Sequence, residues 1–181
     1  MQIHRPQFIA LVSLVMIFII SGCATSPKVT PEMSEQIRQM AEMRDTCTQY
    51  AAWVARDYPS TAPEYKKAQQ LYIEASASAN SYIEALQFTV LSGGSFSSEK
   101  NETAAQRVHD SGKAFLDYAR EAVGVPKTRF LPLVIPLAGS LVDLGNKVSS
   151  SVKSANQQQR ELIAKSIGDK KWKPFNELTR P

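Results

Sequence analysis

The sequence is poor in the side chains that usually build metal and nucleophilic sites. Its 181 residues include two cysteines, Cys23 and Cys47, and two histidines, His4 and His109. These four residues form no Cys/His cluster with the spacing of a metal site. The sequence therefore predicts that the protein binds no metal ion.

The sequence also lacks the local strings that mark common enzymes and nucleotide-binding proteins. It contains no G-x-S-x-G, H-E-x-x-H, Walker A or G-x-G-x-x-G string. A glycosidase needs only two carboxylates and no local motif. Here, however, the carboxylates are spread along stretches that read as the polar faces of helices. We therefore expect a protein that is not an enzyme and that takes no cofactor.

No apolar run approaches the ~20 residues that a membrane-spanning helix needs. The longest run at the N-terminus, Phe8 to Ile20, has 13 residues without a charge. His4 and Arg5 precede it, and the small residues Ser21 and Gly22 follow it. This order is typical of an export signal, so residues 1–22 are predicted to be a cleaved signal peptide.

The end of this signal, Ile20-Ser21-Gly22-Cys23, resembles the lipobox of bacterial lipoproteins. The resemblance covers residues 1–23 and implies cleavage before Cys23, which then carries a diacylglycerol and an N-acyl chain such as palmitate. By the sorting rule of this class, Ala24 implies the outer membrane of a Gram-negative envelope, with the protein facing the periplasm. The alternative is an ordinary secretory signal that happens to end near a cysteine.

Processing at this point changes the charge and the thiol content of the chain. Loss of residues 1–22 removes one of the 21 basic residues and none of the 17 acidic ones, so the formal charge falls from +4 to +3. The chain has no dense basic cluster with interleaved aromatics, so nucleic acid is not an expected partner. Cys47 is left as a lone thiol, either a small core residue or one half of a bond to another chain. His109 becomes the sole histidine, placed at the edge of a helix.

Residues 23–30 read as the lipidated cysteine and a short tether, and residues 31–168 read as one helical domain. Helices are predicted over 31–57, from a T-x-x-E capping box at Thr61–Glu64 to about residue 91, from Ser97 or Ser98 to about 123, and from near Pro136 to about 167. Each carries apolar residues at alternating steps of three and four, and Leu162 is counted on the apolar face of the last helix. The fold class predicted is all-α, an antiparallel up-down-up-down four-helix bundle with coiled-coil-type packing.

Two apolar segments are candidate contact sites. Residues 130–144 could fill the core, dock a partner or dip into the bilayer. The C-terminal tail, residues 169–181, could pack on the bundle or serve as a recognition peptide. The side chains proposed to contact a partner or lipid are Phe130, Leu131, Leu133, Val134, Ile135, Leu137, Trp172 and Phe175.

These features favour a non-enzymatic, membrane-anchored envelope lipoprotein that binds an envelope protein partner. Such a protein would act as an assembly accessory in a secretion, conjugation or appendage system. One alternative is a helical lipoprotein that binds a lipid or another amphiphile between the small residues at 75–81 and the 130–144 segment. Another is an immunity or exclusion lipoprotein.

Overall fold

The computed structural model describes residues 29–121 and 135–178, and within those two ranges the chain is all-helical. The five α-helices there are α2 (Pro31–Asp57), α3 (Pro63–Ser92), α4 (Ser98–Glu121), α5 (Ala138–Val152) and α6 (Gln157–Gly168). A short 3-10 helix, η2 (Phe175–Glu177), follows in the tail. The predicted all-α class is confirmed, whereas the predicted signal peptide and tether, apart from Val29 and Thr30, lie outside the described residues.

The helix ends show which local signals direct the fold. Thr30 caps α2, its hydroxyl accepting a hydrogen bond from the backbone N–H of Met33 at 3.2 Å. The capping box expected at Thr61–Glu64 is wrong, because the N-cap of α3 is Ala62 and it makes no side-chain hydrogen bond. Pro63 opens α3 instead, with a ring that suits the first helical position. Gly93 ends α3 with a φ of 67°, a conformation that glycine adopts without steric cost.

The single fourth helix expected from about 136 to 167 is two helices. The chain leaves α5 after Val152 and restarts at Asn156, whose side chain accepts from the Gln159 N–H at 3.0 Å. The Gln159 side chain accepts from the Asn156 N–H at 2.8 Å, which completes a capping box. The break shifts the phase of the apolar face, so Leu162 is 69% exposed rather than buried.

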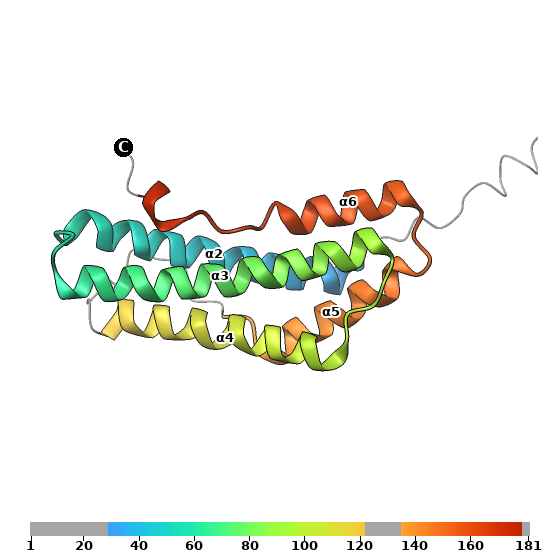
Figure 1. Cartoon of the computed structure of the whole chain (residues 1–181), viewed down its shortest axis with the longest axis horizontal. Helices are drawn as coiled ribbons and strands as arrows, with labels where there is room; N and C mark the ends of the chain where they lie inside the picture. The colour runs from blue at the N-terminus through green and yellow to red at the C-terminus, as the bar shows by residue number, and fades with distance from the viewer. Residues whose placement is uncertain (1–28, 122–134, 179–181) are drawn as a thin grey trace, which may run out of the picture.

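Contacts between the helices show how α5 runs relative to its neighbours. Met33 of α2 meets Ser151 of α5, and Gln36 meets Asp143. Asn101 near the start of α4 meets Asn146 of α5, and His109 further along meets Pro136 just before α5. Helix α5 is therefore antiparallel to both α2 and α4. Figure 1 shows α3 at the middle of the assembly, with α4 below it and α6 above it.

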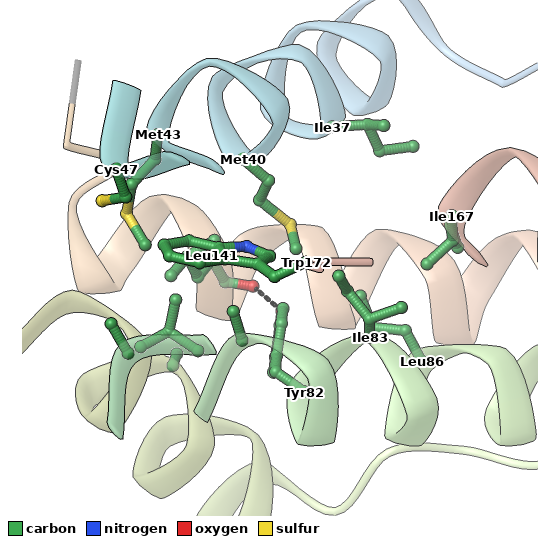
Figure 2. Packing of buried hydrophobic residues seen from close by; sticks show 14 of the residues in the cluster. Ile37, Met40, Met43, Cys47, Tyr82, Ile83, Leu86, Leu141, Ile167 and Trp172 are labelled. Atoms are coloured by element: carbon green, nitrogen blue, oxygen red, sulfur yellow. Dashed lines mark hydrogen bonds between the residues drawn. The ribbon is translucent and has the colours of Figure 1, made fainter. Parts of the chain in front are cut away.

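The core is built from aliphatic, methionine and aromatic side chains contributed by all five helices. Tyr72, Tyr82, Phe115, Leu116, Leu141 and Leu144 are among the residues with no exposed surface. Figure 2 shows Met40, Met43 and Cys47 of α2 above the α3 side chains, with the Tyr82–Leu141 hydrogen bond dashed. Cys47 is a free, buried thiol whose pKa is raised by burial. It is therefore a core residue in this structure, and its sulfur is not presented to another chain.

One end of the molecule gathers the start of α2, the α3–α4 turn and the α5–α6 link. We call it the tether end, because the chain reaches it from Cys23. Met33 lies beside Ser151 there, and the Arg160 side chain lies against Gly93. None of the helices in the described residues is long and apolar enough to cross a membrane.

Candidate functional site

The small-residue stretch of α3, residues 75–81, meets three different environments. Ala75 and Ala79 point into the core and are 0% and 1% exposed. Ser76 and Asn80 lie on the side that the C-terminal tail covers. Ser78 and Ser81 turn toward α4, and Ala77 borders the hollows on both sides. The helical repeat of 3.6 residues divides the stretch in this way.

On the α4 side the small side chains leave an open groove of about 500 Å³. We call it the α3–α4 groove. It is lined by Ala77, Ser78, Ser81 and Tyr82 of α3 and by Glu99, Lys100, Thr103, Ala104 and Arg107 of α4. An alanine or a serine cannot fill the space between two helix ridges, and the long α4 side chains extend toward solvent instead.

The groove offers hydroxyls and positive charge. Lys100 and Arg107 are seven residues apart, so two helical turns place them on the same face of α4. Neither side chain has an ion-pair partner within residues 29–121 and 135–178. Ser81 and Thr103 add hydroxyl donors, and Glu99 adds one carboxylate. The Ser78 hydroxyl donates to the Glu74 carbonyl at 2.9 Å, so only its oxygen is available as an acceptor. This lining suits a polar, acidic segment of a partner.

The floor of the groove carries no reactive group. Tyr82 is fully buried, and its hydroxyl donates to the Leu141 carbonyl at 2.5 Å. Burial raises the pKa of the Tyr82 phenol, and hydrogen bonding with the Gly145 backbone opposes this effect. The phenol is therefore held neutral and engaged at neutral pH, and the lining includes no histidine or cysteine. The groove is suited to binding rather than to acid–base or nucleophilic chemistry.

The C-terminal tail packs along the opposite side of the small-residue stretch, where a smaller open hollow of about 380 Å³ remains. Asn80 accepts from the Trp172 N–H at 2.8 Å and donates to the Trp172 carbonyl at 3.2 Å. The Tyr72 hydroxyl donates to the Lys173 carbonyl at 2.9 Å. The Tyr72 ring centroid lies 5.7 Å from those of both Trp172 and Phe175. The tail is thus fixed by backbone hydrogen bonds and by aromatic contacts.

The structure accounts for the predicted contact residues in three ways. Trp172 and Phe175 are 5% and 3% exposed, so their rings pack in the bundle, the first of the two alternatives for the tail. Ile135 is half-buried against the core, and Leu137 is 70% exposed. The remaining predicted residues, Cys23, Phe130, Leu131, Leu133 and Val134, lie outside the described residues.

His109 is held by the segment that leads into α5. Its Nδ1 lies 3.1 Å from the Pro136 carbonyl oxygen, so this nitrogen carries the proton and donates. The ring is half-buried at the edge of α4. It joins two segments of the fold, as a boundary residue does, and the α3–α4 groove lies elsewhere on α4.

The α3–α4 groove was not among the sites predicted from the sequence. The small residues at 75–81 are readable as a close helix contact, and the structure uses only part of them in that way. The missing signal is on α4, where Lys100, Thr103, Ala104 and Arg107 share one face at steps of three and four. None of these four has a bulky apolar side chain that could fill the hollow.

Comparison with known proteins leaves the chain without an identified relative. No protein-family model matches it, and neither the curated proteins nor the solved structures provide a match. Across the part of the chain that the structure describes, no three His, Cys, Asp or Glu side chains are grouped so as to hold a metal ion. The groove, the tether end and the N-terminal motif are therefore the features that bear on function.

Proposed function

We propose that this protein is a non-enzymatic envelope lipoprotein, an up-down helical bundle that binds a protein partner beside the membrane. Its role would be that of an assembly accessory in a secretion, conjugation or appendage system of the cell envelope. The α3–α4 groove is the observation that carries the proposal. It is open, lined by hydroxyls and by the cations of Lys100 and Arg107, and floored by an engaged phenol.

The N-terminal sequence supports the membrane part of the proposal. Ile20-Ser21-Gly22-Cys23 resembles a lipobox, and Ala24 favours the outer membrane with the bundle in the periplasm. Seven residues, 24–30, separate Cys23 from α2 and reach at most ~25 Å. The bundle would therefore stand close to the bilayer, and the α3–α4 groove would be presented sideways to a partner.

The lining of the groove defines the chemistry of that partner. A segment with one or two carboxylates would meet the Lys100 ammonium and the Arg107 guanidinium. Its backbone would find the hydroxyls of Ser78, Ser81 and Thr103. Glu99 at the edge would disfavour a partner that carries a carboxylate in every position.

The anchor is tested with a Cys23→Ser variant expressed in a Gram-negative host. The wild-type protein should enter the detergent phase of a two-phase extraction, and its mature N-terminal peptide should carry acyl mass on Cys23. The variant should carry no acyl mass at position 23. An unmodified Cys23 in wild-type protein from such a host would refute the lipoprotein proposal.

The partner is tested by photocrosslinking in the native envelope. A photoreactive residue at Ser81, inside the groove, should give a discrete adduct whose partner peptide is identified by mass spectrometry. The matched control places the same residue at Gln49, which is exposed on α2 and does not line the groove. If Ser81 yields only monomer, or the same adducts as Gln49, the groove does not bind a partner.

A further inference from the structure

Large apolar side chains that face solvent are few in the described residues, and most of them lie near the tether end. They are Ile73, Phe88, Leu91, Leu137 and Leu162, with exposed fractions of 50%, 74%, 56%, 70% and 69%. Phe88 and Leu91 belong to the last turns of α3, and Leu162 belongs to the second turn of α6. Ile73 lies in the first half of α3, far from that end.

Contacts place Phe88, Leu91 and Leu162 around the point where the tether joins the bundle. Phe88 is four residues before Ser92, the last residue of α3, so it lies ~6 Å from that helix end. Arg160, two residues before Leu162, lies against Gly93 just beyond the same end. Val29, which precedes α2, lines a hollow with Ser166 of α6. The α3 and α6 turns in question therefore flank the start of α2 (Figure 1).

The charges at this end are mixed, so charge alone does not explain a membrane contact there. Lys153 and Lys165 are exposed close to it, and so are Glu32 and Glu161. Attraction to anionic headgroups needs a net excess of basic residues. Apolar side chains act differently, because their insertion depends on the surface they remove from water.

We propose that Phe88, Leu91 and Leu162 enter the interfacial region of the bilayer that holds the acyl chains on Cys23. This inference rests on the proposed lipid anchor. The tether of seven residues brings the tether end within ~25 Å of the membrane surface. The three side chains then fix the orientation of the bundle, which the tether alone would leave free.

The experiment measures membrane depth by fluorescence quenching. Phe88→Trp is introduced into the lipidated chain, which is reconstituted into phosphatidylethanolamine/phosphatidylglycerol vesicles that contain brominated acyl chains. The matched control is Ile73→Trp, at an exposed position of the same helix ~22 Å farther from the tether end.

We expect the emission of the indole added at position 88 to fall at least twofold relative to unbrominated vesicles. The emission of the indole added at position 73 should stay unchanged. Subtraction of the parent spectrum removes Trp53 and Trp172.

A second variant tests the contribution of the neighbouring side chains. In the Phe88→Trp background, Leu91→Ser and Leu162→Ser together should reduce the quenching to near the control value. All three positions are solvent-exposed, and an unchanged helical circular dichroism signal will show that the bundle remains folded. Quenching that survives both serines would overturn the role of the two leucines.

The design separates failure of this inference from failure of the lipid anchor. Mass spectrometry first establishes whether Cys23 is acylated. If it is not, Cys23 is coupled to maleimide-bearing vesicles, since Cys47 is fully buried and does not compete for the reagent. The same quenching is then measured. Equal quenching of the Phe88→Trp and Ile73→Trp variants on either kind of tethered protein would refute membrane insertion.

Discussion

The two sides of the small-residue stretch in α3 have similar composition, but the segments that face them fill the adjoining space to different extents. On the tail side, Ser76 and Asn80 lie under a segment that carries two buried aromatic rings. On the α4 side, Ser78 and Ser81 border an open hollow of about 500 Å³. Small side chains therefore leave a hollow on both sides, and the facing segment decides how far it is filled. The tail buries two rings and leaves about 380 Å³, whereas α4 leaves about 500 Å³.

The tail and α4, which face these two sides, differ in whether their backbone hydrogen-bonding groups are already paired. The tail brings backbone groups that Asn80 and Tyr72 bind, together with rings that fill volume. Helix α4 has already paired its own backbone groups, and it brings Lys100 and Arg107, whose charges stay in water.

Removal of a tail ring should have the largest effect on stability. Trp172→Ala deletes a side chain that is 5% exposed and contacts Tyr72, and loss of a buried aromatic residue costs about 3–5 kcal/mol. Urea denaturation followed by circular dichroism measures the change. The control, Trp53→Ala, removes a half-buried tryptophan of α2 and should cost less. An equal loss in both variants would show that the tail does not form part of the core.

Removal of the amide that binds the tail should have an intermediate effect. Asn80→Ala leaves the Trp172 N–H and carbonyl without their partner, at a cost of about 1–3 kcal/mol. The same denaturation series should show less than about 0.5 kcal/mol for Ser81→Ala, an exposed position one residue along. Equal values for the two variants would contradict the difference between the side that binds the tail and the side that faces α4.

A change at Tyr82, on the floor of the groove, should have a smaller and pH-dependent effect on the free energy of unfolding. Tyr82→Phe removes the hydroxyl that donates to the Leu141 carbonyl and should cost about 0.5–1.5 kcal/mol at neutral pH. The pKa of Tyr82 is raised in the folded state, so its contribution is full below pH ~10 and is lost as pH rises above that value. The free energy of unfolding, measured from pH ~8 to ~11 across the unfolded-state value, should therefore fall less steeply in the variant. If the free energy of unfolding falls with pH equally steeply in the variant and the wild type, the raised pKa of Tyr82 is contradicted.

Filling the groove should leave stability almost unchanged while it blocks binding. Ser81→Leu adds volume at an exposed position, and the free energy of unfolding should change by less than about 0.5 kcal/mol. With the photoreactive residue moved to Ser78, which also lines the groove, the partner adduct should disappear in the Ser81→Leu background. A Gln49→Leu variant serves as control and should keep the adduct.

Local helix signals in the sequence predict some features of the fold and miss others. Thr30-Pro31 marks the start of α2 because both residues act on their own backbone, and Gly93 marks the end of α3 for the same reason. The sequence does not reveal the break before Asn156, because apolar residues recur at steps of three and four on both sides of the short link, although their phase changes across it. The capping box predicted from Thr61–Glu64 is wrong, because α3 begins at Pro63.

The candidate site was less predictable than the helices. A groove forms where the side chains of two facing segments leave space between them. The sequence does not show this space, because Ser81 and Arg107, which line it, are 26 residues apart. The sequence around Trp172 and Phe175 is compatible with a tail that packs on the bundle and with a recognition peptide. The choice depends on whether Asn80 and Tyr72 lie opposite the tail, which the sequence does not show. Leu162 was expected on an apolar face only because α5 and α6 were read as one helix.

The break between α5 and α6 also affects the order in which the bundle is completed. Helix α6 and the tail cover the side of α3 that carries Gln87 and Asn80, and they are synthesised after the helices that they cover. Until those residues emerge, that side of α3 has no cover from α6 or the tail. A shortened chain that ends before Gln157 should therefore expose the side of α3 that α6 and the tail cover, and proteases should cut it faster than a chain that includes both segments.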